Sequence, residues 1–128
     1  MLATPAPRDG FYHRAVLLSD LKRERLGGCE ICPQPGAGTW RMRIRGVEVK
    51  LSGPGRAETY ERILRAEGGR LVFRRASTAC RLLDGRIAGG EGIYAFRLTA
   101  TRLVLRKVRD NCPTRAAIVT GIWERGTG

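Results

Sequence analysis

Four cysteines carry the most distinctive chemistry in this chain of 128 residues. Cys29 and Cys32 form a Cys-x-x-Cys pair, while Cys80 and Cys112 each stand alone. A redox pair normally lies at a helix N-terminus, which lowers the thiol pKa, but this pair precedes Pro33 in a predicted loop. A structural zinc site is typically marked by a second Cys-x-x-Cys, which the chain lacks. We therefore expect no metal, and we interpret Cys29 and Cys32 as a local disulfide.

Cys80 and Cys112 also favour a disulfide, because small extracytoplasmic domains use such bonds to supplement a small core. The bond would close a loop of about 30 residues and contribute about 3–4 kcal/mol in the chain-entropy description. The alternative is two buried thiols that pack as small hydrophobic groups. If the disulfides form, we expect a secreted or extracytoplasmic protein, and otherwise a cytoplasmic one. Residues 1–9 contain no apolar signal segment.

One histidine and the absence of a spaced carboxylate pair give little support for catalysis. His13 is a candidate general base, but Phe11, His13 and Ala15 alternate as the outward face of a predicted strand. Asp110 lies in a predicted turn, where its side chain is expected to bond to nearby backbone. No glycine-rich segment fits a nucleotide-binding fingerprint. The catalytic residues of any reaction are therefore unknown, and we expect no cofactor.

The charge balance is strongly basic, with 24 basic and 12 acidic residues and a net charge of +12. Such a balance attracts phosphates, anionic lipids or acidic ligands. Alternatively, arginine is simply the favoured surface cation, since 21 of the basic residues are Arg and 3 are Lys. No run of five basic residues marks a nucleic-acid-binding arm, which disfavours nucleic acid as a partner. No stretch approaches the ~18 apolar residues of a transmembrane segment.

Most of the chain shows the alternation of period two that predicts β-strands. One clear case begins at Trp40, where Arg41, Arg43 and Arg45 lie on the face opposite to the apolar residues, and after Gly46 the alternation resumes to Leu51. The segment Thr59–Ala66 fits either a helix or a strand. Further strands are predicted over Phe11–Leu18, Leu71–Phe73, Gly92–Leu98, Leu103–Val108 and Ala116–Trp123.

One helical segment, Asp20–Leu26, is predicted between a Ser19 cap and the Gly27-Gly28 stop signal. About eight to ten short strands with regular turns favour a sandwich or a barrel, and a barrel leaves no exposed strand edges. The fold class is therefore all-β, with a single antiparallel sheet and one short helix near the N-terminus. We expect a flexible lead-in over residues 1–8, one domain over 9–125, and a tail over 126–128.

The chain resembles the small lipocalin-like (calycin-type) β-barrel domains of actinobacterial proteins over residues 9–125. The resemblance rests on Asp9-Gly10-Phe11-Tyr12, Ser19-Asp20-Leu21, Gly38-Thr39-Trp40, Gly92-Ile93-Tyr94-x-Phe96, Asp110-x-Cys112-x-x-Arg115 and Gly121-Ile122-Trp123-x-Arg125. It implies an up-and-down barrel that binds a small apolar or amphipathic molecule, including an anionic one, in its interior. Some related barrels catalyse cyclisation or isomerisation, so a pathway enzyme without metal is an alternative. A binder of nucleic acid or anionic surfaces through scattered arginines is a third hypothesis.

Aromatic and basic residues supply the candidate pocket. We expect the ligand to contact Trp40, Tyr60, Tyr94 and Phe96, with Arg62 and Arg97 available to an acidic head group through bidentate contacts. The alternative is that all these aromatics are plain core. By the resemblance, Tyr12 and Trp123 are structural, and Arg115 or Arg125 packs over the aromatic ring of the first strand.

Overall fold

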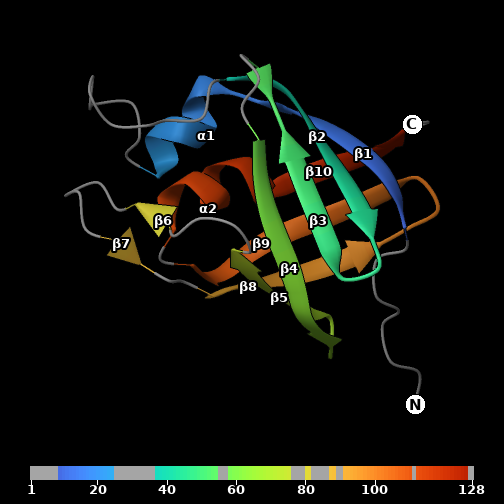
Figure 1. The fold of residues 1–128 in the computed structure, drawn as a ribbon. Helices are drawn as coiled ribbons and strands as arrows, with labels where there is room; N and C mark the ends of the chain where they lie inside the picture. The colour runs from blue at the N-terminus through green and yellow to red at the C-terminus, as the bar shows by residue number, and fades with distance from the viewer. Residues whose placement is uncertain are drawn as a thin grey trace.

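Eight strands close into one antiparallel barrel, in the order β1-β10-β9-β8-β5-β4-β3-β2 (Figure 1). The computed structural model describes residues 9–24, 37–54, 58–75, 80–81, 87–88, 91–110 and 112–126. The barrel strands are β1 (Gly10–Val16), β2 (Gly38–Arg45), β3 (Glu48–Ser52), β4 (Glu58–Glu67), β5 (Arg70–Arg75), β8 (Glu91–Leu98), β9 (Arg102–Asp110) and β10 (Gly121–Gly126). A separate two-stranded sheet contains β6 (Cys80–Arg81) and β7 (Ile87–Ala88).

The expected all-β antiparallel barrel is confirmed, and the ambiguous segment Thr59–Ala66 is a strand within β4. Alternate residues of β1 and β2 are buried and exposed, so one face of each strand is turned to the interior. Phe11, His13 and Ala15 lie on the exposed face, as their spacing predicts. The Cys29-x-x-Cys32 loop and the lead-in of residues 1–8 lie outside the described residues.

Two short helices, α1 (Leu18–Arg23) and α2 (Pro113–Val119), contact each other beside one end of the barrel (Figure 1). The first begins and ends earlier than the predicted Asp20–Leu26. The N-cap residue is Leu17 and not Ser19, and Asp20, at the third position of the helix, accepts a hydrogen bond from the Leu17 N–H at 2.8 Å.

The second helix corrects the prediction of a single helix and of a closing strand over Ala116–Trp123. Pro113 occupies the first turn, where its fixed φ suits a helix and its missing N–H costs nothing. The apolar run that resembles a strand, Ala116–Val119, is instead buried on all sides of a short helix. The closing strand β10 starts only at Gly121, after the helix has ended at Thr120.

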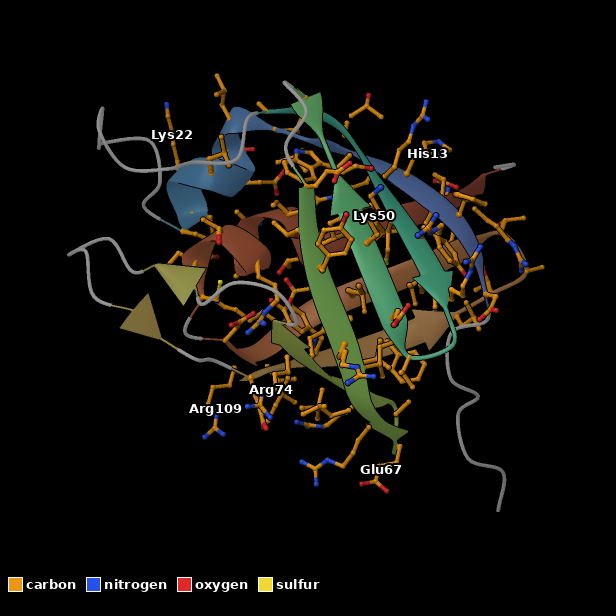
Figure 2. All side chains as sticks on the ribbon, in the orientation of Figure 1. His13, Lys22, Lys50, Glu67, Arg74 and Arg109 are labelled. Carbon is orange, nitrogen blue, oxygen red and sulfur yellow. The ribbon has the colours of Figure 1, made fainter. Side chains whose placement is uncertain are left out.

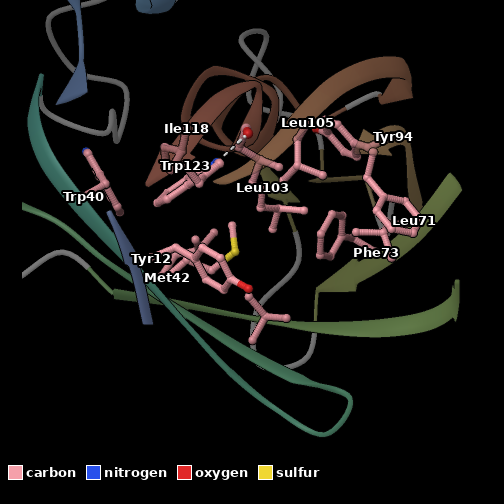
Figure 3. Packing of buried hydrophobic residues seen from close by; sticks show 14 of the residues in the cluster. Tyr12, Trp40, Met42, Leu71, Phe73, Tyr94, Leu103, Leu105, Ile118 and Trp123 are labelled. Atoms are coloured by element: carbon pink, nitrogen blue, oxygen red, sulfur yellow. Dashed lines mark hydrogen bonds between the residues drawn. The ribbon is translucent and has the colours of Figure 1, made fainter. Parts of the chain in front are cut away.

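The interior of the barrel is a continuous hydrophobic core. Figure 3 shows Tyr12, Met42, Leu103, Leu105 and Trp123 packed around its centre. Phe73 and Tyr94 meet edge to face, with ring centroids 5.5 Å apart. The indole N–H of Trp123 donates to the Val119 carbonyl at 2.9 Å, which satisfies the one polar atom of this ring.

Candidate functional site

A buried cluster of charged side chains joins α2 to the barrel wall. The guanidinium of Arg115 donates to both carboxylate oxygens of Asp110, with each N–O distance 2.8 Å, and to Glu61 at 2.9 Å. Tyr94 donates its hydroxyl proton to the same Asp110 carboxylate. The side chain of Arg115 is completely buried. The cluster therefore ties together β4, β8, β9 and α2.

Electrostatics favour the protonated forms of Arg115 and Tyr94 in this cluster. Burial alone would lower the pKa of Arg115, but the hydrogen bonds and negative charges of Asp110 and Glu61 outweigh it and raise that pKa. Burial and the nearby Asp110 carboxylate raise the pKa of Tyr94, so the phenol stays protonated as a donor. Tyr94 and Arg115 are closed off from solvent, so we interpret the cluster as structural.

A second buried cation, Arg14, joins the two helices to β1. It donates to the carbonyl oxygens of Ala117 and Ile118 near the C-terminus of α2 and to Asp20 of α1 at 3.0 Å. A cation at this helix end complements the helix dipole. The guanidinium carbon of Arg14 also lies 5.9 Å from the ring centroid of Trp123.

Of the two arginines predicted to pack over the first-strand aromatic ring, Arg115 belongs to the charged cluster, and packing of Arg125 on Tyr12 stays a prediction. Arg125 is directly opposite Tyr12 in the register of β1 and β10, and its guanidinium lies close to Gly10. Tyr12 and Trp123 are core residues, 1% and 0% exposed.

The barrel wall divides the six residues predicted to bind a ligand. Trp40, Tyr94 and Phe96 face the interior and are at most 7% exposed. The other three, Tyr60, Arg62 and Arg97, lie on the outer surface. The structure therefore does not bring these six side chains together around one space.

Side chains fill the described part of the barrel interior. A cavity that held a ligand would leave its lining accessible to a water-sized probe. Leu51, Leu71, Tyr94 and Leu103 have no exposed surface, and Leu105 is 1% exposed. An internal ligand stays a prediction, and it would require these side chains to move apart.

A groove with a volume of about 600 Å³ lies instead on the outer face of β1, β2 and β3. Its volume falls within the range of about 300–1,000 Å³ typical of small-molecule sites. Figure 2 shows His13 and Lys50 projecting from this part of the barrel. The lining includes Phe11, His13, Thr39, Arg41, Arg43, Lys50 and Ser52.

Strand register places the groove side chains next to one another. Arg43 is directly opposite Phe11 on one side and Lys50 on the other. One step along the strands, Arg41 lies between His13 and Ser52. Directly opposed residues have Cβ atoms about 4.5–5.5 Å apart. Three basic side chains therefore share one small area of the sheet.

Few negative charges offset these cations. Lys50 pairs with Glu58 at 3.3 Å on the edge of the groove. Hydrogen bonds from Lys50 and Tyr60 lower the pKa of Glu58. Within the described part of the chain, no carboxylate pairs with Arg41 or Arg43 at the 4.0 Å limit for an ion pair. Adjacent like charges destabilise a sheet. An anionic ligand would relieve this repulsion, so the arrangement favours an anion.

Sequence reasoning missed this groove, although its signal was present. The alternation of Arg41 and Arg43 with apolar residues places both outside, and the same alternation places Phe11 and His13 outside. What the sequence does not contain is the pairing of β1 with β2, which brings these residues together. A ligand expected inside the barrel also favours inward-facing side chains as candidates, and the groove residues face outward.

The protein is a closed eight-stranded antiparallel β-barrel, compatible with a lipocalin-like fold, with a groove on its outer wall that is lined by basic residues. No family model matches the chain, and neither the curated proteins nor the solved structures contain a match to it. Neither of the two described helices is long and apolar enough to cross a membrane. The described residues contain no cluster of three His, Cys, Asp or Glu suited to a metal ion.

Proposed function

We propose that the protein is a non-catalytic binder of a small anionic molecule that also has an apolar or aromatic portion. The site of binding is the outer groove. The observation that carries this proposal is the grouping of Arg41, Arg43 and Lys50 over a space of about 600 Å³ beside Phe11. The exposed Phe11 ring, 40% exposed, offers an apolar surface to the same ligand.

Each groove residue has a chemical role in this proposal. Arg41 and Arg43 present planar guanidinium groups suited to bidentate contacts with a phosphate or carboxylate. Lys50 adds a compact charge, and the Ser52 hydroxyl is a donor that an anionic oxygen accepts. Phe11 packs against the uncharged part of the ligand.

Phenyl phosphate is a suitable probe, because it joins a dianion to one aromatic ring. Titration is followed by amide chemical shifts, with inorganic phosphate and benzyl alcohol as comparison probes. We expect phenyl phosphate to bind more tightly than either, because only it uses both Phe11 and the cations. Hydrogen bonds to charged groups contribute about 1.5–3 kcal/mol each, so the double variant Arg41→Gln/Arg43→Gln should bind at least tenfold more weakly.

A matched control removes the same charge elsewhere. The double variant Lys22→Gln/Lys107→Gln changes an exposed lysine of α1 and a lysine paired with Glu24. Its affinity for phenyl phosphate should stay within about twofold of the parent protein. Equal losses in both double variants would contradict the groove, since they would show a response to net charge alone. Tighter binding of benzyl alcohol than of phenyl phosphate would favour an internal apolar site.

We also propose that the protein is related to the calycin-type barrels of actinobacterial proteins that it resembles. This resemblance supports ligand binding as its general activity. We further propose a Cys80–Cys112 disulfide and an extracytoplasmic location. Cys112 is completely buried, and no described cysteine is a free thiol, which supports the pairing. Its sulfur lies 3.3 Å from the Thr114 hydroxyl oxygen.

A further inference from the structure

A second basic surface covers the outer wall of the barrel around β5 and β8, away from the groove. It consists of six exposed arginines from four neighbouring strands, and we name it the arginine face. In the view of Figure 2, Arg74 and Arg109 project from one side of the barrel and His13 from the other. The members of the arginine face are Arg65, Arg70, Arg74, Arg97, Arg106 and Arg109.

Strand register builds the arginine face in rows across the sheet. One row places Arg70 and Arg106 on either side of Ala95. The next row runs from Arg65 through Val72 and Ile93 to Arg109. Neighbouring strands lie about 4.8 Å apart, and alternate residues of a strand about 6.6 Å apart. The guanidinium groups are therefore spread over an extended surface and do not converge on one point.

A buried apolar residue, Val72, lies on the outer wall among the strands of the arginine face. Val72 is only 6% exposed, yet it does not belong to the core cluster inside the barrel. Its register neighbours on this face are Arg65 and Ile93. Arginine stems commonly cover apolar surface in this way while the charged ends remain in water. Packing of this kind over Val72 would leave the guanidinium groups facing outward.

Negative charge on this surface is limited to its margins. Glu67 is opposite Arg70, and Glu91 is opposite Arg74. None of the six arginines has an ion pair at 4.0 Å or less with a carboxylate of the described residues. With the two glutamates counted, six positive charges less two leave a local charge of +4.

We propose that the arginine face binds the phosphate backbone of a nucleic-acid duplex without reading its sequence. A polyanion matches an extended surface of separated guanidinium groups. Single-strand sites normally stack bases on aromatic side chains. The described residues of β5, β8 and β9 expose none, and the exposed Tyr60 of β4 lies beside Lys50 of the groove. Membrane surfaces favour apolar side chains that insert. The described residues of β5 and β8 expose no large apolar side chain, and the exposed Leu64 of β4 and Val108 of β9 each directly precede an arginine.

The test measures binding of a labelled 20-base-pair DNA duplex by fluorescence anisotropy between 50 and 200 mM NaCl. The triple variant Arg70→Gln/Arg106→Gln/Arg109→Gln removes three neighbouring phosphate contacts. Each contact contributes about 0.9 to the slope of log affinity against log salt. We expect that slope to become shallower by about 2.7, and affinity at 150 mM to fall at least tenfold.

Two controls separate this proposal from bulk charge and from the groove. The triple variant Lys22→Gln/Lys107→Gln/Arg125→Gln loses the same charge outside the arginine face, and its duplex affinity at 150 mM should change less than threefold. The groove variant Arg41→Gln/Arg43→Gln should also keep duplex binding while it loses phenyl phosphate.

Three results would overturn the proposal. The first is no duplex binding by the parent protein at 50 mM NaCl. The second is an equal loss in the two triple variants. The third is binding to vesicles that contain phosphatidylserine but not to the duplex. None of these results bears on the groove, whose test uses phenyl phosphate.

Discussion

Removal of the Arg115 guanidinium should destabilise the barrel more than any other single loss of charge. In Arg115→Met, the carboxylates of Asp110 and Glu61 lose a completely buried partner that holds them at 2.8–2.9 Å. Breaking a buried ion pair by removing one member costs about 3–5 kcal/mol, because the remaining charge is left uncompensated.

This cost corresponds to a large fall in Tm. Unfolding entropy is about 2.1 cal/mol/K per residue, which for 128 residues gives about 0.27 kcal/mol/K. The expected fall is therefore roughly 11–19 °C. Urea unfolding provides the free energy directly, because Trp40 and Trp123 are both buried and report on loss of the core by fluorescence.

Two further variants make the measurement decisive. Arg97→Met removes an exposed arginine and should change stability by no more than about 0.5 kcal/mol. Arg115→Met combined with Asp110→Asn and Glu61→Gln should recover part of the loss, because no buried charge then lacks a partner. A loss below about 1 kcal/mol for Arg115→Met alone would refute the idea that this cluster holds α2 against the barrel.

Three other experiments test separate parts of the structure. Gly92→Ala places a methyl carbon 2.5 Å from the Asp110 carboxylate and should cost about 1–3 kcal/mol by overpacking. The control is Gly126→Ala, whose methyl carbon would lie 3.2 Å from the His13 ring. It should cost less in the same urea experiment. Burial would raise the pKa of Asp20, but the Leu17 N–H and the charges of Arg14 and Arg23 outweigh it and lower that pKa. The stabilisation by Asp20 is therefore complete above the ordinary aspartate pKa near 4 and is lost as pH falls through the pKa of the folded state. The difference in stability between the parent protein and Asp20→Asn should shrink from pH 6 to pH 3. A constant difference would contradict this. Peptide mapping without reduction should recover Cys80 linked to Cys112, and recovery of both as free thiols would disprove the disulfide.

The sequence was sufficient to predict most of the strands because their signal is local, whereas closure into a barrel was predicted from the number of strands, the protection of their edges and the resemblance. Alternation along β2 identifies the inward face residue by residue, and turn glycines separate the strands. The same local reasoning failed at α2, where Ile118 and Val119 have strand propensity. There the helix is set by Pro113 and by burial of the whole segment against neighbouring elements, which no short window contains.

The candidate sites were harder to predict because they depend on register. Tyr60 and Arg62 have the chemistry of ligand contacts, but the alternation in β4 places both on the outer wall. The arginines of the arginine face are never consecutive in a long run, so a search for basic runs overlooks them. Pairing of β5 with β8 and β9 brings them together, and a single sequence does not specify which strands become neighbours.

The location of a bound anion is the most direct test of the central claim, that the ligand site lies on the outer wall. Phenyl phosphate is titrated into labelled protein, and the amides of the groove and the methyl groups of the core are followed together by NMR. We predict saturable shifts at the amides of His13, Arg41 and Lys50, with the methyls of Leu71 and Leu103 unchanged. Saturable shifts at those methyls without shifts in the groove would contradict the account and place the ligand inside the barrel.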